Sequence, residues 1–502
     1  MTHTKKYSRE QVVEQFAEYE ATHPVEEYRF YDWHAWPMLR LAVGGYLVGL
    51  TSPPVKRPPW RRFAARCART VRPYWPQIRE HQPSSFSPGE RSEVALLTPS
   101  NRSEMIGGVL WHPVADPIAA KLRENGISVQ VWERGPIRRP RRQEPIWIQE
   151  QLNIAATNAQ RRRPVTCDRA ARTWLRELAN WATVVLDRTI PYDHLPLQAA
   201  AIQYKSHLYE RWFEQLGCRC FLVDTWYGPP SFPALIAARR LGIPSIDIQH
   251  GVQGPHHYAY SGWTRQPENG FEIVPDASWL WGNHPVHYGD HRPMRAVTVG
   301  NLWINLWRQR TERAIEEEIT QARRLTEGYN RTILVTTQPI VDMLPFYDAI
   351  AYSPRDWRWL VRIHRATDAD GRTAILEQLG RLDHPGVEVD RACRLPLYAL
   401  MQVADVHMTG FSTCALEALA FRTPTIIVHP SGQTAFGEFI NDRLMGYAET
   451  GKDIISAVER MTSLDDGELR TISNELFQDE PDASEACLEL VRQMLAPQSA
   501  TV

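Results

Sequence analysis

The 502-residue chain has 43% hydrophobic and 23% charged residues, and its 57 Lys and Arg residues nearly balance 58 Asp and Glu residues, for a formal net charge of −1. One hydrophobic core stops growing at roughly 250 to 300 residues, so two domains are expected. The composition excludes a disordered or collagen-like chain, and the balanced charge argues against a nucleic-acid-binding protein, which needs a domain-wide positive field. We expect a folded protein with no nucleic-acid partner.

The cysteines and the first fifty residues indicate an unexported protein. Seven cysteines with no CxxC pair make neither a disulfide framework nor a zinc ribbon. The opening MTHTKKYSRE lacks the apolar core of a signal peptide. The apolar run at residues 33–50 contains His34, Arg40 and a Gly pair, whereas a membrane span needs about 20 predominantly apolar residues. The run therefore predicts a buried helix, and the chain is expected in the cytoplasm.

Residues 1–90 predict a helical appendage followed by a basic, aromatic linker. The linker, residues 56–79, carries eight Lys and Arg residues and no acidic one, interleaved with Trp, Phe and Tyr. Arginines and aromatic rings suit an anionic membrane surface, here at the inner face. A solvated linker fits the same composition.

From Glu93 onward, short β-branched and aliphatic runs alternate with amphipathic helices, a pattern typical of parallel βαβ units. The expected strands are residues 94–98, 127–132, 220–225, 245–249 and 278–282. Between two of them, PALIAARRLGIP predicts a helix that ends near Gly242 and Pro244. We assign residues 91–305 to an N-terminal Rossmann-like domain that holds the acceptor of the reaction inferred below.

A polar helix over roughly residues 306–328 precedes a second alternating series. Its expected strands are residues 332–337, 358–364, 387–390, 405–409 and 425–429. We assign residues 306–502 to a C-terminal Rossmann-like domain. The expected fold is α/β, with two Rossmann-like domains facing a cleft and a helical appendage.

In open α/β sheets, ligands bind beyond the carboxyl ends of the strands, so the residues after each strand are candidates. One strand ends in Thr409, followed by a turn with Gly410, Ser412 and Thr413 and a helix that carries Glu417. Such a turn offers backbone N–H groups and hydroxyls to a phosphate, and Glu417 offers a carboxylate to ribose hydroxyls. A simple helix cap would look the same. Neither GxGxxG nor GxxxxGK[ST] is present.

The order of a strand, a small turn, the acidic helix ALEALAFRTP and another strand is similar to the donor half of GT-B glycosyltransferases, particularly those of bacterial capsule and surface-polysaccharide synthesis. DIQHG and RIHR extend the resemblance to Kdo and sialic acid transferases and to teichoic acid glycerophosphate transferases. In these enzymes a His-Gly and a second His line the cleft, and the matching positions are His250 with Gly251, and His364. Here Arg365 follows His364 where the family usually has proline.

Three side chains are candidate catalytic groups. His250 follows an expected strand, and a histidine that titrates near neutrality suits a general base for an acceptor hydroxyl. Asp224 is a second candidate base or a partner of His250, with a helix cap as its alternative role. A cationic His364, with the bidentate fork of Arg365, would neutralise the leaving phosphate.

Further contacts are expected around these groups. Those on the acceptor side or in the cleft are Gly251, His256, His257, Thr337 and Gln338, and His429 is a further donor contact.

No metal is expected. His250, His256 and His257 lack an obvious carboxylate or a helical i, i+4 pair. The Asp368 and Asp370 pair in ATDADGRT fits a turn that caps a helix.

The predicted function is a metal-independent glycosyltransferase that requires no cofactor. It would move a sugar from a nucleotide-activated donor to a surface-glycan or glycolipid acceptor. The resemblance favours CMP-Kdo or CMP-sialic acid as donor. A UDP-sugar 2-epimerase-like enzyme and a non-catalytic assembly protein with the same fold are the alternatives.

Overall fold

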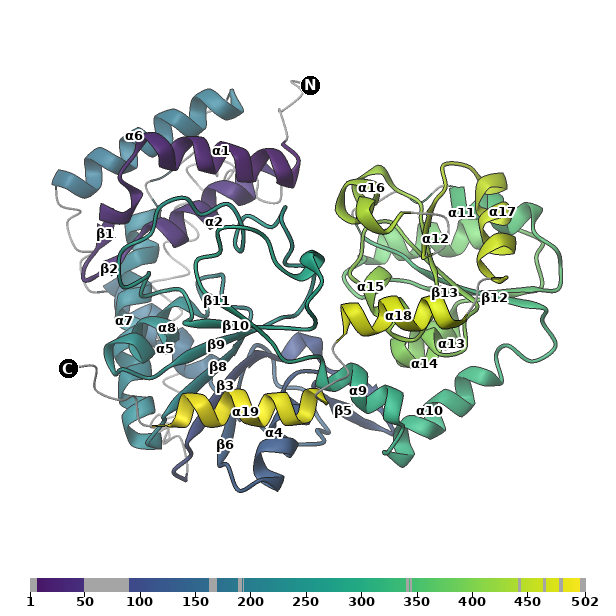
Figure 1. The fold of residues 1–502 in the computed structure, drawn as a ribbon, viewed down its shortest axis with the longest axis horizontal. Coiled ribbons are helices and arrows are strands. Elements are labelled where there is room, and N and C mark those ends of the chain that lie inside the picture. The colour runs from purple at the N-terminus through teal and green to yellow at the C-terminus, as the bar shows by residue number, and fades with distance from the viewer. Residues whose placement is uncertain are drawn as a thin grey trace, which may run out of the picture.

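The computed structural model of the protein describes residues 7–48, 90–161, 169–187, 192, 194–339, 343, 345–440, 444–463, 466–477 and 482–496. Figure 1 shows two lobes side by side, each containing one large sheet. The basic linker at residues 56–79, for which a membrane surface was one expected partner, lies outside the described residues.

The N-terminal lobe contains seven parallel strands in the order β11-β10-β9-β8-β3-β6-β7. The strands are β3 (Val94–Pro99), β6 (Val129–Arg134), β7 (Ile146–Trp147), β8 (Cys220–Asp224), β9 (Ser245–Ile248), β10 (Ala277–Leu280) and β11 (Arg295–Thr298). The helices between them are α4 (Ala115–Glu124), α5 (Gln149–Arg161), α6 (Arg169–Leu186), α7 (Leu195–Leu216) and α8 (Phe232–Arg240). Helix α8 ends as predicted, and Gly242 after it has the left-handed φ of +66° that glycine tolerates best.

The central strand β3 shows why its sequence is apolar throughout. Ala95 and Leu97 belong to the hydrophobic cluster on one face of the sheet, and Val94 and Leu96 belong to the cluster on the other. A parallel strand covered on both faces has no side that can be polar. Beyond β3, an antiparallel hairpin of β4 (Glu104–Ile106) and β5 (Val109–Trp111) precedes α4.

The C-terminal lobe contains six parallel strands in the order β14-β13-β12-β15-β16-β17. They are β12 (Arg331–Thr336), β13 (Trp357–Arg362), β14 (Val387–Glu388), β15 (Val406–Thr409), β16 (Thr425–Ile427) and β17 (Met445–Tyr447). The helices are α11 (Pro345–Tyr352), α12 (Ala369–Gly380), α13 (Asp390–Arg394), α14 (Leu397–Met401), α15 (Cys414–Ala420), α16 (Pro430–Phe436), α17 (Gly451–Met461) and α18 (Asp466–Leu476). The prediction of two Rossmann-like domains, each built on a parallel sheet, is confirmed.

Two helices connect the lobes where the sequence predicted one over residues 306–328. They are α9 (Leu302–Gln309) and α10 (Arg313–Arg323). The break falls at Arg310, whose φ of 53° is left-handed and ends α9.

The appendage belongs to the core of the N-terminal lobe. Its helices are α1 (Arg9–Thr22) and α2 (Trp36–Leu47), with the short strands β1 (Arg29–Phe30) and β2 (Trp33–His34) between them. Helix α2 confirms the buried helix predicted within residues 33–50, and its apolar residues share one cluster with those of α6, α7 and β8. The described helices include none with the length and apolar character that a membrane crossing requires.

The last helix, α19 (Ala483–Leu495), also differs from the expected domain assignment. Figure 1 shows α19 beneath the N-terminal lobe, apart from the rest of the C-terminal sequence. Its residues Ala483, Cys487, Leu488, Leu490 and Val491 pack with the inner faces of β3 and α4. The assignment of all residues 306–502 to the second domain is therefore wrong at this end, because the apolar face of α19 is buried on the first sheet.

A buried ion pair fixes the appendage to the loop after β9. Glu20 and Arg40 are fully buried and paired, and Glu20 Oε2 accepts from the backbone N of Thr264 at 2.6 Å. Arg40 donates to the carbonyl oxygens of Ser261, at 2.7 Å, and Tyr258, at 3.0 Å. The helices α1 and α2 thus support the loop that begins at His250.

Replacing Glu20 by Ala is expected to lower the free energy of unfolding by about 3–5 kcal/mol, because the Arg40 charge would remain buried without its partner. Urea denaturation of the full chain measures the change. Glu14→Ala, an exposed substitution on the same helix, serves as the control and should shift the unfolding free energy by less than about 0.5 kcal/mol. Equal effects of both substitutions would contradict the assigned role of the pair.

Candidate active site

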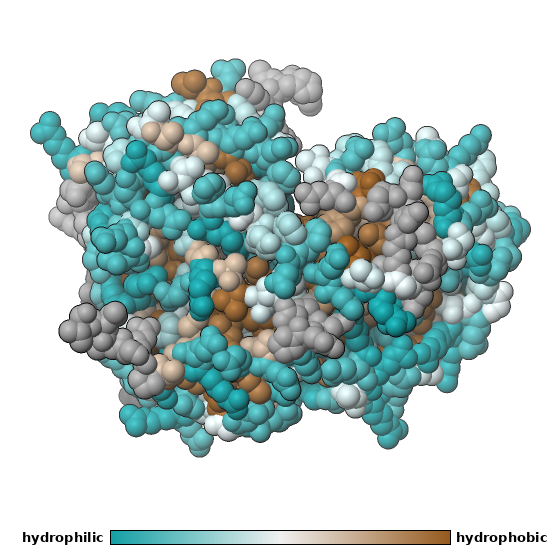
Figure 2. All heavy atoms as spheres, viewed as in Figure 1, coloured by the Kyte–Doolittle hydropathy of each residue, from teal (hydrophilic) through white to brown (hydrophobic). Residues whose placement is uncertain are grey.

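A cavity of about 630 Å³ lies between the lobes, at the carboxyl ends of both sheets. Figure 2 shows a furrow between the lobes with hydrophobic residues inside it and a mainly hydrophilic surface around it. The polar residues that line the cavity include Asn101, Arg102, Glu104, Arg138, Gln249, His250, Asn301, Thr336, Thr337, Arg362, His364, Arg365, Tyr398, Ser412 and Glu417. Nine of these residues lie within three positions after the carboxyl end of a strand, where ligands bind in open α/β sheets: Asn101, Arg102, Gln249, His250, Asn301, Thr337, His364, Arg365 and Ser412.

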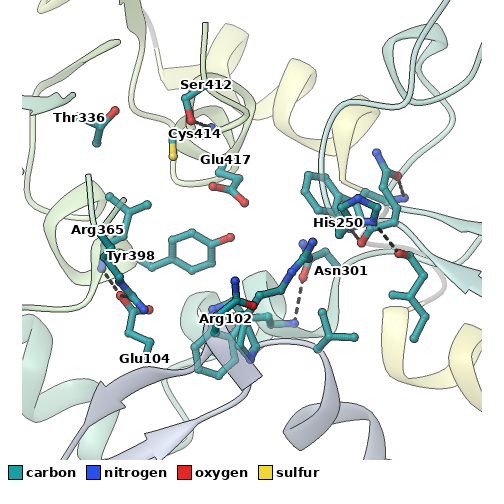
Figure 3. Close-up of a pocket in the computed structure, with 18 of the residues that line it drawn as sticks. Arg102, Glu104, His250, Asn301, Thr336, Arg365, Tyr398, Ser412, Cys414 and Glu417 are labelled. Carbon is teal, nitrogen blue, oxygen red and sulfur yellow. Dashed lines mark hydrogen bonds and ion pairs between the residues drawn. The ribbon is translucent and has the colours of Figure 1, made fainter. Parts of the chain in front are cut away.

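Glu417 supplies a carboxylate to the C-terminal wall. It lies on α15 and faces the Tyr398 hydroxyl, which projects from α14 toward the middle of the cavity (Figure 3). Burial raises the pKa of Glu417, while hydrogen bonds from Tyr398 and Cys414 oppose the rise. Burial and the adjacent carboxylate hold the pKa of Tyr398 well above its ordinary value, so its hydroxyl remains a donor. The pair can accept and donate hydrogen bonds to the hydroxyl groups of a ligand.

The turn after β15 contributes Ser412 to the cavity lining, but its neighbours serve other contacts. Thr409 Oγ1 donates to the Thr336 carbonyl at 3.1 Å, inside the sheet. Thr413 Oγ1 accepts from the backbone N of Val252 at 3.4 Å, across the interlobe contact. The expected donor contacts at Thr409 and Thr413 are therefore structural contacts in this arrangement.

Three further predicted residues support the cavity walls without lining them. Gln338 Oε1 accepts from the backbone N of Phe411 at 2.7 Å and so holds the turn that includes Gly410. His429 Nδ1 accepts from the backbone N of Ser431 at 3.1 Å and caps α16. None of Gly410, Gln338 and His429 borders the cavity.

His364 and Arg365 follow β13 and border the cavity together with Thr337. Thr337 Oγ1 accepts from the backbone N of His364 at 3.1 Å, which fixes the start of this loop. Burial lowers the pKa of His364, and the neighbouring Arg365 and Arg362 lower it further. The expectation of a cationic His364 is therefore contradicted, and the positive charge of this wall resides in the two arginines.

His250 lines the cavity in a neutral form. Its Nδ1 lies 3.4 Å from the Ile248 carbonyl, which can only accept, so Nδ1 carries the hydrogen and Nε2 accepts from the Tyr227 hydroxyl at 3.1 Å. Burial, Arg102 and His257 lower the pKa of His250 well below its ordinary value. The expected titration near neutrality is contradicted. A proton acceptor at this position would have to release the hydrogen bond from Tyr227.

The residues after His250 play supporting roles. Gly251 approaches the opposite lobe so closely that an added Cβ would lie 3.3 Å from Thr413 Oγ1. His257 Nδ1 accepts from the backbone N of Ala259 at 3.3 Å, and burial lowers the pKa of His257 to about 3. Neither His256 nor His257 borders the cavity, so the expected acceptor contacts at these histidines are not part of it.

Asp224 is fully buried and outside the cavity lining. Its Oδ1 pairs with Arg102 Nη1 at 3.0 Å, and Arg102 Nη2 donates to Thr225 Oγ1 at 3.2 Å. Burial raises the pKa of Asp224, while Arg102 and Arg134 oppose the rise. None of the three predicted roles, base, partner of His250 or helix cap, matches the contacts of Asp224, which holds the guanidinium of Arg102 at the cavity.

Glu104, on the hairpin strand β4 of the N-terminal lobe, makes polar contacts to the C-terminal lobe. Its Oε1 accepts from Arg362 at 3.1 Å and from the backbone N of Leu397 at 3.0 Å, and it lies 3.6 Å from Arg365 Nη2. Figure 3 shows Glu104 and Arg365 side by side at the cavity edge. Arg365 also donates to the Ser103 carbonyl at 2.7 Å. One carboxylate thus orients both cavity arginines of the other lobe.

Sequence reasoning missed Arg102, Glu104, Arg138 and Asn301. Arg102 follows the strand run VALLTP by three residues, so the rule that selected Ser412 and His250 selects Arg102 as well. The other three carry no local signal.

The described residues hold no cluster of three or more His, Cys, Asp or Glu side chains placed to bind a metal ion. Asp368 accepts from the backbone N of Gly371 at 2.8 Å and caps α12, as ATDADGRT predicted.

No family model and no curated protein sequence matches the chain. Similar solved structures include the UDP-GlcNAc 2-epimerase from Neisseria meningitidis bound to UDP-GlcNAc, with 12% identity, a TM-score of 0.46, and coverage of 80% of this chain and 99% of that one. The UDP-GlcNAc 2-epimerase from Methanocaldococcus jannaschii in complex with UDP-GlcNAc and UDP has 10% identity, a TM-score of 0.44 and coverage of 80% and 99%. MurG from Acinetobacter baumannii has 12% identity, a TM-score of 0.41 and coverage of 80% and 99%. Similarity at this level assigns no function.

Replacing Glu104 by Ala should increase amide hydrogen exchange of the segment 396–401 about tenfold, because the Leu397 N–H loses its acceptor and both arginines lose their orienting charge. Exchange followed by mass spectrometry measures this. Glu317→Ala, an exposed substitution on α10, should leave the segment unchanged. Unaltered protection in the Glu104 variant would contradict the interlobe contact.

Asp247 on β9 should make stability depend on pH. Burial raises the pKa of Asp247 to about 7, so the folded state binds its proton more tightly than the unfolded state, where the pKa is about 4. The resulting stabilisation is fully present below about pH 4 and is lost as the pH rises to about 7. The free energy of unfolding, measured by urea denaturation between about pH 4 and about pH 7, should fall less in Asp247→Asn than in wild type. The exposed substitution Asp370→Asn should show the same fall as wild type. If the free energy of unfolding of Asp247→Asn and of wild type changed in parallel with pH, the raised pKa of Asp247 would be refuted.

Proposed function

We propose that the protein is a glycosyltransferase that binds a nucleotide-activated sugar in the interlobe cavity and transfers the sugar to a surface-glycan or glycolipid acceptor. The observation that carries the proposal is the cavity itself: two parallel sheets direct their carboxyl ends into one space, with a carboxylate at Glu417 and guanidinium groups at Arg362 and Arg365 on one wall. This combination suits a ligand with both hydroxyl groups and phosphate.

The C-terminal wall supports a role in donor binding. Glu417 would accept hydrogen bonds from ribose hydroxyls, and Ser412 offers a hydroxyl nearby. The Arg365 side chain is 54% exposed at the cavity edge, which leaves its guanidinium accessible to a phosphate. Arg362 is less accessible and would add charge to the same wall.

Catalysis would rest on positioning and on stabilisation of the leaving phosphate by arginine. The neutral state of His364 leaves Arg365 and Arg362 as the cations for this task. His250, with its hydrogen bond from Tyr227, is the proposed group that orients the acceptor hydroxyl or receives its proton. Closure of the lobes on the donor would exclude water from the reaction.

The proposed donor and cellular setting are drawn from the resemblance to capsule and Kdo transferases described above. It supports a CMP-activated sugar, Kdo or sialic acid, as donor. It also supports action at the cytoplasmic face of the membrane, with residues 56–79 as the proposed contact to anionic lipid. The proposed reaction uses no metal and no cofactor besides the nucleotide-sugar co-substrate.

The test measures binding of CMP, UDP, GDP and CDP to the full chain by thermal shift and by saturation-transfer NMR. One nucleotide should raise the unfolding temperature of wild type, and Glu417→Gln should weaken its binding about tenfold or more, since a charge-assisted hydrogen bond is lost. Glu459→Gln, on the exposed surface of α17, is the matched control and should bind like wild type.

The result that overturns the proposal is the absence of binding for all four nucleotides. Once a nucleotide is found, its sugar conjugates separate transfer from epimerisation. Formation of a C2-epimerised sugar from UDP-GlcNAc without any acceptor would assign the chain to the epimerases instead.

A further inference from the structure

Arg138 is an exposed cation at the edge of the cavity. It belongs to the arginine run RRPRR on the loop between β6 and β7. The other arginines of this run have acidic partners: Arg139 with Glu144 at 2.6 Å, Arg141 with Glu133, and Arg142 with Glu312 at 2.6 Å. Arg138 is exposed and lines the cavity, and the described part of the chain provides it with no ion pair.

The loop that carries Arg138 is anchored on both sides of it. Before Arg138, Gly135 packs so closely on the loop after β3 that an added Cβ would lie 2.6 Å from Ser100 Oγ. After it, the backbone N of Leu110 donates to the Pro140 carbonyl at 2.8 Å, and the backbone N of Arg142 donates to the Leu110 carbonyl at 3.0 Å. These contacts hold Arg138 beside the N-terminal wall of the cavity.

Arg102 provides a second guanidinium on the same wall, where it contacts a residue with an uncommon backbone conformation. Thr225, which accepts from Arg102 Nη2, has a φ of 77°, a conformation that a β-branched residue rarely adopts. Asp224 forms an ion pair with Arg102, whereas no acidic side chain among the described residues pairs with Arg138. The arginines of the opposite wall face Glu104. Among the four arginines that line the cavity, Arg138 is therefore the one for which the described residues provide no acidic partner.

We infer that Arg138, assisted by Arg102, forms a subsite for an anionic group, a carboxylate or a phosphate, on the acceptor. This inference rests on the proposed function, since it assigns the N-terminal wall to the acceptor and the C-terminal wall to the donor. A planar guanidinium without a counter-ion binds either anion through paired N–H donors. The subsite would select acidic acceptors over neutral ones.

Saturation-transfer NMR titrations at low salt test the subsite with two anionic probes and their neutral counterparts. The probes are methyl β-glucuronide against methyl β-glucoside, and glycerol 3-phosphate against glycerol. We expect at least one anion to bind about tenfold or more tightly than its counterpart, and Arg138→Gln to remove that advantage. The glucuronide identifies a carboxylate acceptor and glycerol 3-phosphate a phosphorylated one.

Arg139→Gln is the matched control, because it removes the neighbouring charge without altering the cavity lining, and it should bind both anions like wild type. The subsite is refuted if neither anion is preferred, if Arg138→Gln retains the preference, or if Arg139→Gln loses it equally. The nucleotide that binds wild type in the panel of CMP, UDP, GDP and CDP is titrated in the same samples and should bind Arg138→Gln like wild type. Absence of binding by all four nucleotides would count against the proposed function, whereas nucleotide binding without an anion preference in wild type counts only against the subsite.

Discussion

The ion-pair contact of Glu104 helps to fix how the two lobes meet, together with a hydrophobic cluster that residues of both lobes share. This single carboxylate of the N-terminal lobe accepts hydrogen bonds from Arg362 and from the backbone of Leu397, and it lies beside Arg365. Its side chain is only 12% exposed, so removal of either charge would leave the other poorly solvated. The cost of desolvating the charges offsets much of the attraction in a buried ion pair, so its net contribution to stability is small, whereas loss of one partner is costly. Here the arrangement of the lobes places two arginines at the cavity, and the opposite lobe therefore helps to build the proposed donor wall.

The sheet architecture was largely predictable because parallel strands covered on both faces must be apolar along their length. Runs such as VALLT and TILVTT therefore mark the central strands β3 and β12 directly. The sequence did not predict the edge strands β7, β11 and β17, the hairpin β4–β5 or the short pair β1–β2. Strand β11, for example, has the partly exposed sequence RAVT and lacks the apolar run of a central strand. The packing of α19 on the first sheet could not be predicted either, because an amphipathic helix does not show which of two sheets it will cover.

The candidate site was predictable where it depends on local order along the chain. His250, His364, Arg365, Ser412 and Glu417 all follow expected strands, and all line the cavity. Prediction failed where a position depends on two segments far apart in sequence. Asp224 ends a strand as expected, yet Arg102 covers it, and Glu104 becomes important only because the C-terminal lobe presents Arg362 to it. Whether a polar side chain faces a ligand or another side chain is decided by such tertiary contacts.

The neutral forms of His250 and His364 follow from burial and from the positive charge of the neighbouring arginines. Guanidinium groups beside His250 and His364 add to burial, and both effects disfavour a second positive charge. Burial acts in the opposite direction on Glu417, where it favours the protonated form. A cavity that already holds four arginines among its lining residues, Arg102, Arg138, Arg362 and Arg365, has no need of an imidazolium to neutralise a phosphate. The histidines are then free to act as neutral hydrogen-bonding groups, and the chemistry of a negatively charged ligand would be controlled by arginines whose charge does not change with pH.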